Sequence, residues 1–215
     1  MDFAIVLVAA GSSTRMGFDK AWADLEGQPL LAHAVAMARQ AQPSELVLVV
    51  GPDRLADASA LAPDAQVVPG GPRRRDSVAA GVAACGATWV AVHDAARALA
   101  PARLFCEGLA AAQPTGAAIP VLPLVDTIKQ VVDGRVRSTL PRADYALVQT
   151  PQVFRRDLLT RALDSSDRDV TDEATLAEHL GVSVATFRGD QRAFKLTTPL
   201  DIIVARAILR QAAPE

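Results

Sequence analysis

The residues best suited to chemistry lie where an apolar run gives way to small residues and then to two cations. An unbroken aliphatic run ends directly before Ala9, Ala10 and Gly11. Because these residues carry almost no side-chain bulk, their backbone amides can approach an anion closely. Arg15 and Lys20 follow and add a planar fork and a mobile point charge, which suit the oxygens of a polyphosphate. The stretch therefore predicts a phosphate-binding loop.

Two common phosphate fingerprints do not fit this loop. Residues 11–17 read GSSTRMG. A dinucleotide-binding loop requires GxGxxG, and a P-loop requires GxxxxGK followed by Ser or Thr. A small-residue turn between a strand and a helix remains the alternative interpretation, because such turns are common.

A second unusual loop reads GGPRRRDSV over residues 70–78, so that two glycines and a proline precede three arginines. Asp76 or Ser77 is expected to cap the helix that follows. Three consecutive arginines are usually a solvated charge run, and that interpretation stands beside a ligand role for any one of them.

The segment VHDAAR follows a predicted strand over residues 89–92. Asp94 supplies the hard oxygen that a nucleotide-bound magnesium ion prefers, and Arg97 can face an incoming phosphate. A lone aspartate after a strand is also often a helix cap. His93 is expected to pack behind the site rather than to act as a base.

Near the C-terminus, Lys195 falls on a predicted strand over residues 192–196, in an apolar neighbourhood that suggests an anion partner. The next residues have the pattern of a helix start, with Thr198 as the cap and Pro199 at the first helical position. Asp201, at the third position, is therefore interpreted as structural.

Strand and helix patterns alternate along the chain. Further strands are expected over residues 45–51, 66–68, 116–121 and 183–187, and helices over residues 30–38, 101–113 and two stretches between 157 and 180. This alternation predicts an α/β fold of Rossmann-like type, with a mostly parallel sheet and helices on both faces. Since α/β sheets bind ligands beyond the carboxyl ends of their strands, the loops named above are expected to meet there.

The pattern changes in residues 126–139, DTIKQVVDGRVRST, which alternate on both sides of Asp133 and Gly134. That dipeptide predicts a two-residue hairpin turn. Isolated hairpins are only marginally stable, so an arm over residues 124–150 is expected to pack against a second copy of itself. We therefore expect one domain over residues 1–215 with an inserted arm, and a homodimer.

Composition narrows the class of protein. The 215 residues suit one α/β domain, and a net charge of −2 with interspersed signs gives no general surface for nucleic acid or membrane. Cys85 and Cys106 lie far apart in apolar segments and fit buried thiols in a reducing compartment. Asp2 stands where a signal peptide needs positive charge, and the first apolar run is too short to cross a bilayer. These features predict a cytoplasmic protein.

Five ordered motifs resemble the 2-C-methyl-D-erythritol 4-phosphate cytidylyltransferases, a nucleotidyltransferase family with ribitol-5-phosphate relatives. They are the AAG…RMG loop with its later lysine, the GGxxRxxSV segment, VHDAAR, the hairpin with its DTxK and QTPQ segments, and the terminal KLTTP. The resemblance implies transfer of a cytidylyl group from CTP to the polyol phosphate in non-mevalonate isoprenoid biosynthesis, with Mg²⁺ and an arm-mediated homodimer. The alternatives are a ribitol-5-phosphate cytidylyltransferase, a molybdenum cofactor guanylyltransferase and a non-catalytic nucleotide-binding sensor.

The resemblance also implies a role for each matching residue. The catalytic cations are Arg15, Lys20 and Lys195; the nucleotide-binding residues are Ala9, Ala10, Gly11, Gly71 and Ser77; the substrate-binding residues are Arg97, Thr127, Arg142 from the neighbouring subunit, Thr150 and Thr171; and Asp94 is the metal ligand. For Thr171 a helix cap, offered by either Thr171 or Asp172, is the alternative explanation.

Three departures from the family pattern leave specific points open. Pro72 replaces an acidic residue that some relatives place near the base, and Ala193 replaces a frequent asparagine, so a second metal ligand is not identified. Ala98 stands where the VHDAAR element usually continues with proline. The choice between methylerythritol phosphate and ribitol phosphate depends on hydroxyl contacts that a sequence does not reveal.

Overall fold

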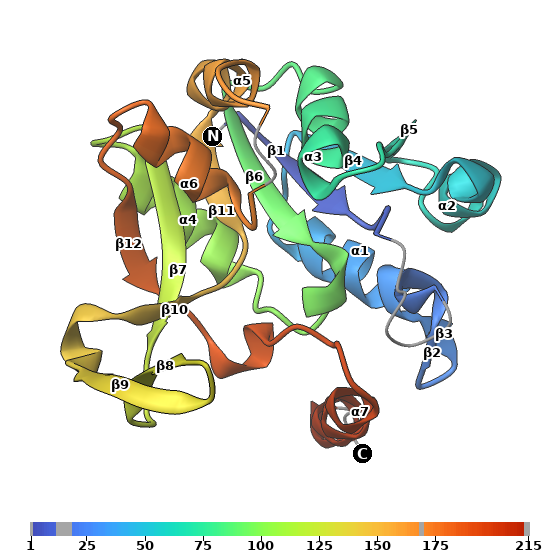
Figure 1. The fold of residues 1–215 in the computed structure, drawn as a ribbon. Coiled ribbons are helices and arrows are strands. Elements are labelled where there is room, and N and C mark those ends of the chain that lie inside the picture. Colours follow the sequence, from blue (N-terminus) through green and yellow to red (C-terminus); the bar gives the residue numbers. More distant parts are fainter. Residues whose placement is uncertain (1, 12–18, 168–169, 213–215) are drawn as a thin grey trace.

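A mostly parallel sheet forms the centre of the molecule in the computed structural model, which describes residues 2–11, 19–167 and 170–212 (Figure 1). Its strands in these residues are β1 (Phe3–Val8), β4 (Glu45–Val50), β5 (Gln66–Pro69), β6 (Trp89–Asp94), β7 (Ala117–Pro123), β10 (Ala146–Val148), β11 (Gln152–Arg155) and β12 (Ala185–Arg188). Their order is β10-β7-β11-β6-β1-β4-β5, and β12 also pairs with β7.

Strand β1 lies between β6 and β4 and is parallel to both. Strand β11 runs antiparallel to β6 and β7, which makes the sheet mixed on that side. In the β1–β6 register Val8 lies opposite Asp94, so these two strands end at the same level. The loop that follows β1 and the acidic end of β6 are thereby placed side by side.

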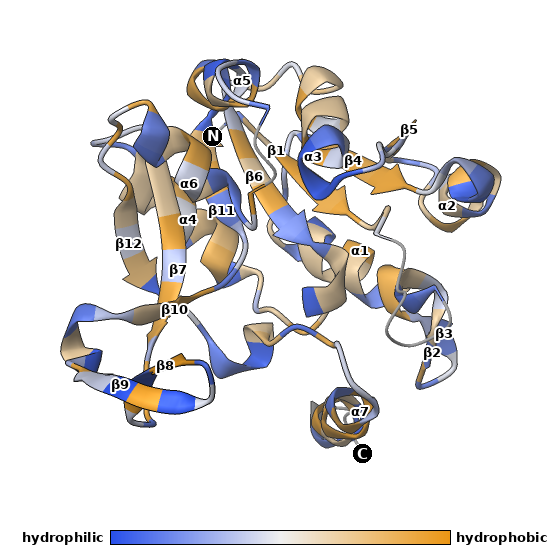
Figure 2. Ribbon diagram, viewed as in Figure 1, coloured by the Kyte–Doolittle hydropathy of each residue, from blue (hydrophilic) through white to orange (hydrophobic). Residues whose placement is uncertain are grey.

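Helices cover both faces of the sheet. Helices α1 (Leu30–Gln40), α2 (Leu55–Leu61) and α4 (Arg103–Ala112) contribute to one apolar core, and α3 (Arg74–Ala83), α5 (Arg156–Asp164) and α6 (Glu173–His179) to the other. Side chains of β1 alternate between them, since Ile5 and Leu7 belong to the first core and Ala4 and Val6 to the second. Figure 2 shows β1 and β4 as correspondingly hydrophobic, whereas β6 becomes hydrophilic at its C-terminal end. The predicted α/β architecture is confirmed.

The hairpin arm is also present. Strands β8 (Ile128–Val132) and β9 (Arg135–Leu140) form a separate two-stranded sheet beside β10 (Figure 1). Asp133 and Gly134 have φ angles of 49° and 73°, as a type I′ hairpin turn requires. A second small sheet, β2 (Asp24–Leu25) with β3 (Gln28–Pro29), precedes α1.

The prediction of a strand over residues 192–196 is wrong. A 3₁₀ turn, Gln191–Ala193, is followed by an irregular segment that belongs to none of the sheets formed by the described residues. The alternation that suggested a strand arises because Ala193 and Leu196 are buried, while the Leu196 amide donates to the carbonyl of Ala96. This segment crosses from the β12 side of the molecule to the end of β6.

The predicted start of α3 is wrong, whereas the predicted start of α7 is confirmed. Helix α3 begins at Arg74, so the predicted cap at Asp76 or Ser77 is misplaced; Asp76 lies in the first turn and accepts from the amide of Arg73. Helix α7 (Pro199–Ala212) begins as predicted, because Thr198 Oγ1 accepts from the Asp201 amide and Asp201 accepts from the amides of Thr197 and Thr198.

One cysteine contradicts the expectation of two buried thiols: Cys85 is buried, whereas Cys106 lies on the outer side of α4 and is exposed.

No helix in the described part of the chain has both the length and the apolar character needed to cross a membrane.

Candidate active site

A cavity of about 480 Å³ opens beyond the carboxyl ends of β1 and β6, where the sequence predicted the site. Its volume lies within the range typical of small-molecule sites. Its lining contains Val8, Ala9, Ala10, Gly11, Lys20, Ala21, Gly71, Pro72, Arg73, Arg74, Ser77, Asp94, Ala95, Ala96 and Lys195. Eight of the predicted site residues therefore meet at one surface: Ala9, Ala10, Gly11, Lys20, Gly71, Ser77, Asp94 and Lys195.

The first loop leaves the sheet immediately after β1, where the Ala9 amide donates to the carbonyl of Val49 at 2.7 Å. Arg15 lies outside the described residues. The Asp19 carboxylate accepts from the Ala21 amide and fixes the short 3₁₀ helix Lys20–Trp22. Lys20 Nζ lies 3.5 Å from the carbonyl oxygen of Thr197, so the loop and the segment before α7 approach each other across the cavity.

The second loop lies close to the first, since a Cβ atom at Gly70 would lie 2.2 Å from Cβ of Ala10. The Gly71 amide donates to Ser77 Oγ at 3.2 Å, and a Cβ atom at Gly71 would lie 2.4 Å from Cβ of Asp76. Only glycine therefore fits there without a shift of the helix start. Ser77 is 2% exposed, so its hydroxyl shapes the loop, while the glycine backbone faces the cavity.

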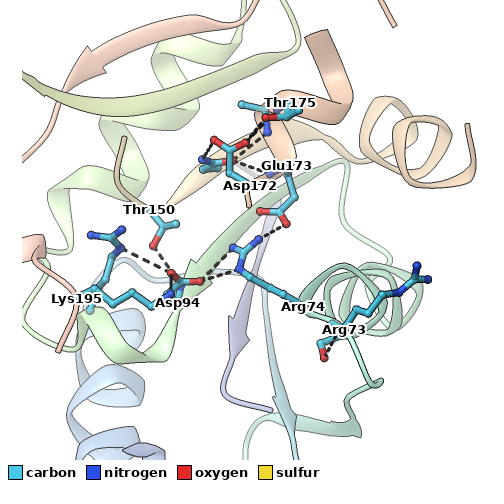
Figure 3. Close-up of polar contacts among 12 residues, drawn as sticks. Arg73, Arg74, Asp94, Thr150, Asp172, Glu173, Thr175 and Lys195 are labelled. Atoms are coloured by element: carbon cyan, nitrogen blue, oxygen red, sulfur yellow. Dashed lines mark hydrogen bonds and ion pairs between the residues drawn. The ribbon is translucent and has the colours of Figure 1, made fainter. Parts of the chain in front are cut away.

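Asp94 is the electrostatic centre of the cavity (Figure 3). Its Oδ1 accepts from Arg74 Nε at 3.2 Å and Nη2 at 3.1 Å, and its Oδ2 accepts from Lys195 Nζ at 2.9 Å. The Asp94 side chain is 9% exposed, whereas the Lys195 side chain is 43% exposed. Burial opposes ionisation of the carboxyl, but Arg74 and Lys195 hold the pKa of Asp94 well below its usual value.

Arg74 and Glu173 belong to this cluster and were missed by sequence reasoning. The second arginine of the RRR run pairs with Asp94 and, through Nη1, with Glu173 Oε1 at 2.5 Å. Its neighbour Arg75 is 8% exposed, so the interpretation of the run as a solvated charge cluster is wrong. The GGxxRxxSV pattern contained a signal for Arg74, because its arginine falls at that position. Glu173, inside the TDEA segment, gave none.

His93 and Thr150 support Asp94 from behind. The Thr150 hydroxyl accepts from the Asp94 amide at 3.1 Å and lies 3.0 Å from His93 Nδ1. His93 Nε2 lies 3.3 Å from the carbonyl of Arg97, which can only accept, so Nε2 carries the proton and Nδ1 accepts from Thr150. Burial lowers the pKa of His93 to about 4, and the ring is neutral at pH 7. The expected packing role of His93 agrees with this geometry.

The predicted acceptor-binding residues do not line the cavity. Arg97 is turned toward the Lys195 segment and donates to the carbonyl of Ala193 at 2.7 Å. Thr127 and Arg142 are exposed residues at the base of the arm, and Arg142 donates to the carbonyl of Val125. Thr171 is exposed, and it does not cap α6; that cap is Asp172, which accepts from the Thr175 amide.

The cavity has one carboxylate in its described lining, Asp94, and no cluster of three or more metal-ligating side chains occurs in the described residues. This donor set suits Mg²⁺ better than a transition metal, because Mg²⁺ is commonly held by one or two carboxylates together with substrate phosphates and water. Ala193 is fully buried and contributes no ligand. The residues present therefore fit a magnesium ion that arrives with a nucleotide.

Comparison with known proteins gives a consistent result. A family model described as 2-C-methyl-D-erythritol 4-phosphate cytidylyltransferase matches residues 3–211. A curated protein of that name from Frankia casuarinae is 44% identical over 220 residues, spanning 98% of this chain and 82% of the relative. One from Dehalococcoides mccartyi is 39% identical over 216 residues, spanning 96% and 95%. The crystal structure of the enzyme of that name from Thermus thermophilus superposes with a TM-score of 0.83 at 34% identity, covering 95% of this chain and 98% of that one.

Proposed function

The chain belongs to the 2-C-methyl-D-erythritol 4-phosphate cytidylyltransferase family, and from this premise we propose how its cavity carries out the reaction. The enzyme transfers a cytidylyl group from CTP to 2-C-methyl-D-erythritol 4-phosphate, giving 4-diphosphocytidyl-2-C-methyl-D-erythritol and pyrophosphate. The observation that carries the proposal is the meeting of Lys20, Asp94 and Lys195 from three distant segments beside two loops of small residues.

The reaction requires charge neutralisation rather than a protein nucleophile. A phosphate monoester is anionic at pH 7 and can attack the α-phosphorus of CTP directly. One P–O bond forms between the acceptor phosphate and the α-phosphorus, and the bond from the α-phosphorus to the bridging oxygen of the β-phosphate breaks. The electron pair leaves with pyrophosphate. Catalysis then consists of holding two anions in line and stabilising the charge that develops.

We assign the triphosphate to the first loop. The backbone of Ala9, Ala10 and Gly11 lines the cavity, and Lys20 stands at its far side. Arg15 and Lys20 neutralise the β- and γ-phosphates of the leaving group. Gly71 and the turn shaped by Ser77 face the nucleoside. Each preorganised cation contributes on the order of 2 to 4 kcal/mol to lowering the barrier.

Lys195 is assigned to the reacting phosphorus. Its exposed ammonium is held by a single carboxylate oxygen of Asp94 at 2.9 Å and is therefore prepositioned rather than locked. On substrate binding it faces the α-phosphate. Asp94 would hold Mg²⁺, which would act as a Lewis acid and spread phosphate charge.

The acceptor half of the site is proposed to form between two subunits. Arg97, Thr127 and Thr171 come from the same subunit as the cavity, and Arg142 comes from the arm of the partner. The predicted contact of Thr150 with the acceptor does not fit, because its buried hydroxyl is already bonded to His93 and to the Asp94 amide. Because Arg142 is exposed and lies away from the cavity of its own chain, contribution to a second copy gives it a function. The exposed apolar residues of the arm support this homodimer.

Pyrophosphate release tests the proposal. The purified protein is supplied with Mg²⁺, one of four nucleoside triphosphates, and methylerythritol phosphate or ribitol phosphate. We expect release with CTP and methylerythritol phosphate, and at least about tenfold less with each other combination, because a misplaced acceptor loses in-line geometry. Equal release with ribitol phosphate would contradict the acceptor specificity, and release with GTP in place of CTP would contradict the base assignment.

A further inference from the structure

Glu173 is a completely buried carboxylate that the reaction described above does not use. Its side chain is 0% exposed at the start of α6, and Oε1 accepts from Arg74 Nη1. Its Oε2 is buried and has no hydrogen-bond partner among the described residues. An unpartnered carboxylate oxygen in such a position is costly, so a second donor in another state of the enzyme is a natural explanation.

The position of Glu173 is fixed from behind. Gln152 on β11 accepts from the amides of Glu173 and Ala174 through Oε1 and donates to Asp172 through Nε2. Gln152 is itself fully buried. It pairs with Val92 of β6, and Val92 precedes Asp94 by two residues. Asp94 at the end of β6 and Glu173 at the start of α6 are therefore both held to neighbouring strands of the sheet, Glu173 through Gln152.

Both oxygens of Asp94 are occupied by cations. Arg74 takes Oδ1 through two nitrogens, and Lys195 takes Oδ2. Because Arg74 fills both lone pairs of Oδ1 and Lys195 fills one of Oδ2, a metal ion can bind Oδ1 only if Arg74 withdraws. Lys195 is half-exposed and can turn to the phosphates, whereas the Arg74 side chain is 23% exposed and has two carboxylate partners in the described structure, Asp94 and Glu173.

We infer that Glu173 is a positioning residue that draws Arg74 away from Asp94 when the metal–nucleotide complex binds. This inference rests on the proposed assignment of Mg²⁺ to Asp94. In the exchange Arg74 gives up Oδ1 of Asp94 and uses the unpartnered Oε2 of Glu173, so that the guanidinium pairs with one carboxylate through two parallel hydrogen bonds. The exchange involves hydrogen bonds only and no covalent bond. Arg74 stays paired with Glu173, and the metal ion takes its place at Asp94.

Binding of Mn²⁺ to the protein–CTP complex, measured by electron paramagnetic resonance without acceptor, tests this inference independently of turnover. Glu173→Gln keeps the size of the side chain but cannot attract Arg74 as an anion does. We expect Mn²⁺ to bind about tenfold to a hundredfold more weakly, the range found when a partner of a metal ligand is removed. Asp172→Asn weakens the cap of the same helix but keeps the Glu173 charge, and its Mn²⁺ affinity is expected to stay within about threefold of wild type.

A double variant separates positioning from a structural role. In Arg74→Gln with Glu173→Gln the competitor for Asp94 is gone and no buried charge is left unpaired, so Mn²⁺ affinity should return to within about threefold of wild type. An affinity as weak as that of the single Glu173→Gln variant would overturn the inference, and so would unchanged affinity in Glu173→Gln. Should the single variant not fold, a double variant that binds Mn²⁺ more than about tenfold more weakly than wild type would still overturn the inference.

Asp94→Asn separates a failure of the metal assignment to Asp94 from a failure of the proposed role of Glu173. Loss of Mn²⁺ binding in Asp94→Asn, together with wild-type binding in Glu173→Gln, would reject the role of Glu173 and leave the metal assignment standing. Wild-type binding in Asp94→Asn would reject the metal assignment itself, and the inference with it.

Discussion

Asp94 keeps its charge in a nearly water-free position because three cations lie around it. Arg74 and Lys195 donate hydrogen bonds to its oxygens, and Arg97 Nε lies 3.8 Å from Oδ2. A buried carboxylate without such neighbours would bind a proton instead. The same arrangement leaves the cavity rich in positive charge once Asp94 accepts a metal ion, which suits two incoming anionic substrates.

His93 gives the first prediction at the scale of residues. Its pKa is lowered to about 4 by burial in the folded protein, against an ordinary value of 6.5 in the unfolded chain. Between these values the unfolded state binds more protons, so the free energy of unfolding decreases as the pH falls from 6.5 to 4, by about 3 kcal/mol from this group.

Urea unfolding at several pH values, in wild type and His93→Gln, measures this contribution, and an NMR titration of the ring gives the pKa directly. The steep loss of stability should be present in wild type and much reduced in the variant. A His93 resonance that titrates near pH 6.5 in the folded protein would contradict the assignment of a neutral buried ring.

Residue types and spacing predicted the cavity better than they predicted its internal contacts. Small residues after β1, Lys20, Asp94 and Lys195 could be chosen because each stands out against its local sequence, and all four line the cavity. Glu173 could not, since an acidic residue in the first turn of a helix is ordinary. Its burial, and its pairing with an arginine 99 positions away, arise only from tertiary packing, in which α6 lies against α5 and β7.

At the scale of elements, local rules worked where local forces decide. The Asp133–Gly134 turn was predictable because few dipeptides adopt positive φ at both positions, and the start of α7 because Thr198 and Asp201 satisfy its first amides. The segment 192–196 was misassigned because period-two burial also arises in irregular chain that crosses a core. A strand additionally requires a partner, which the sequence pattern does not supply.

The arm gives a prediction at this scale. Val131 and Val136 lie directly opposite each other on β8 and β9, and they are 56% and 63% exposed. In the proposed homodimer they pack against the second copy. Replacing both by lysine should convert the dimer to a monomer in sedimentation velocity, because two buried charges at an interface are costly.

The same variant should lose turnover with methylerythritol phosphate while it still binds CTP, because Arg142 from the partner is then absent. Lysines at Ser59 and Ala60, both exposed on α2, add the same charge elsewhere and should leave the dimer intact. A wild-type protein that sediments as a fully active monomer would reject the shared site.

At the scale of the whole molecule, the register of the sheet brings the site together. Val8 lies opposite Asp94, so the loop after β1 and the VHDAAR segment leave the sheet at one level, and the segment before α7 closes the cavity over them. The order of motifs predicted the fold class and the edge of the sheet that carries the site. It did not predict which motifs remain apart: Arg97, Thr127, Arg142, Thr150 and Thr171 are not in the described cavity lining.

In the proposed function the cytidylyl group is transferred in the cavity between Lys20, Asp94 and Lys195. This assignment is tested by measuring the kcat of Lys195→Ala for pyrophosphate release from CTP and methylerythritol phosphate. We predict a kcat about 10² to 10³ lower than wild type at a temperature where the variant remains folded, because the lost cation acts mainly on the charge that develops at the α-phosphorus. Arg210→Ala serves as the control, because it removes from α7 an exposed cation that is paired with Glu26. This variant should retain the wild-type kcat. A kcat for Lys195→Ala within about threefold of wild type would contradict the account.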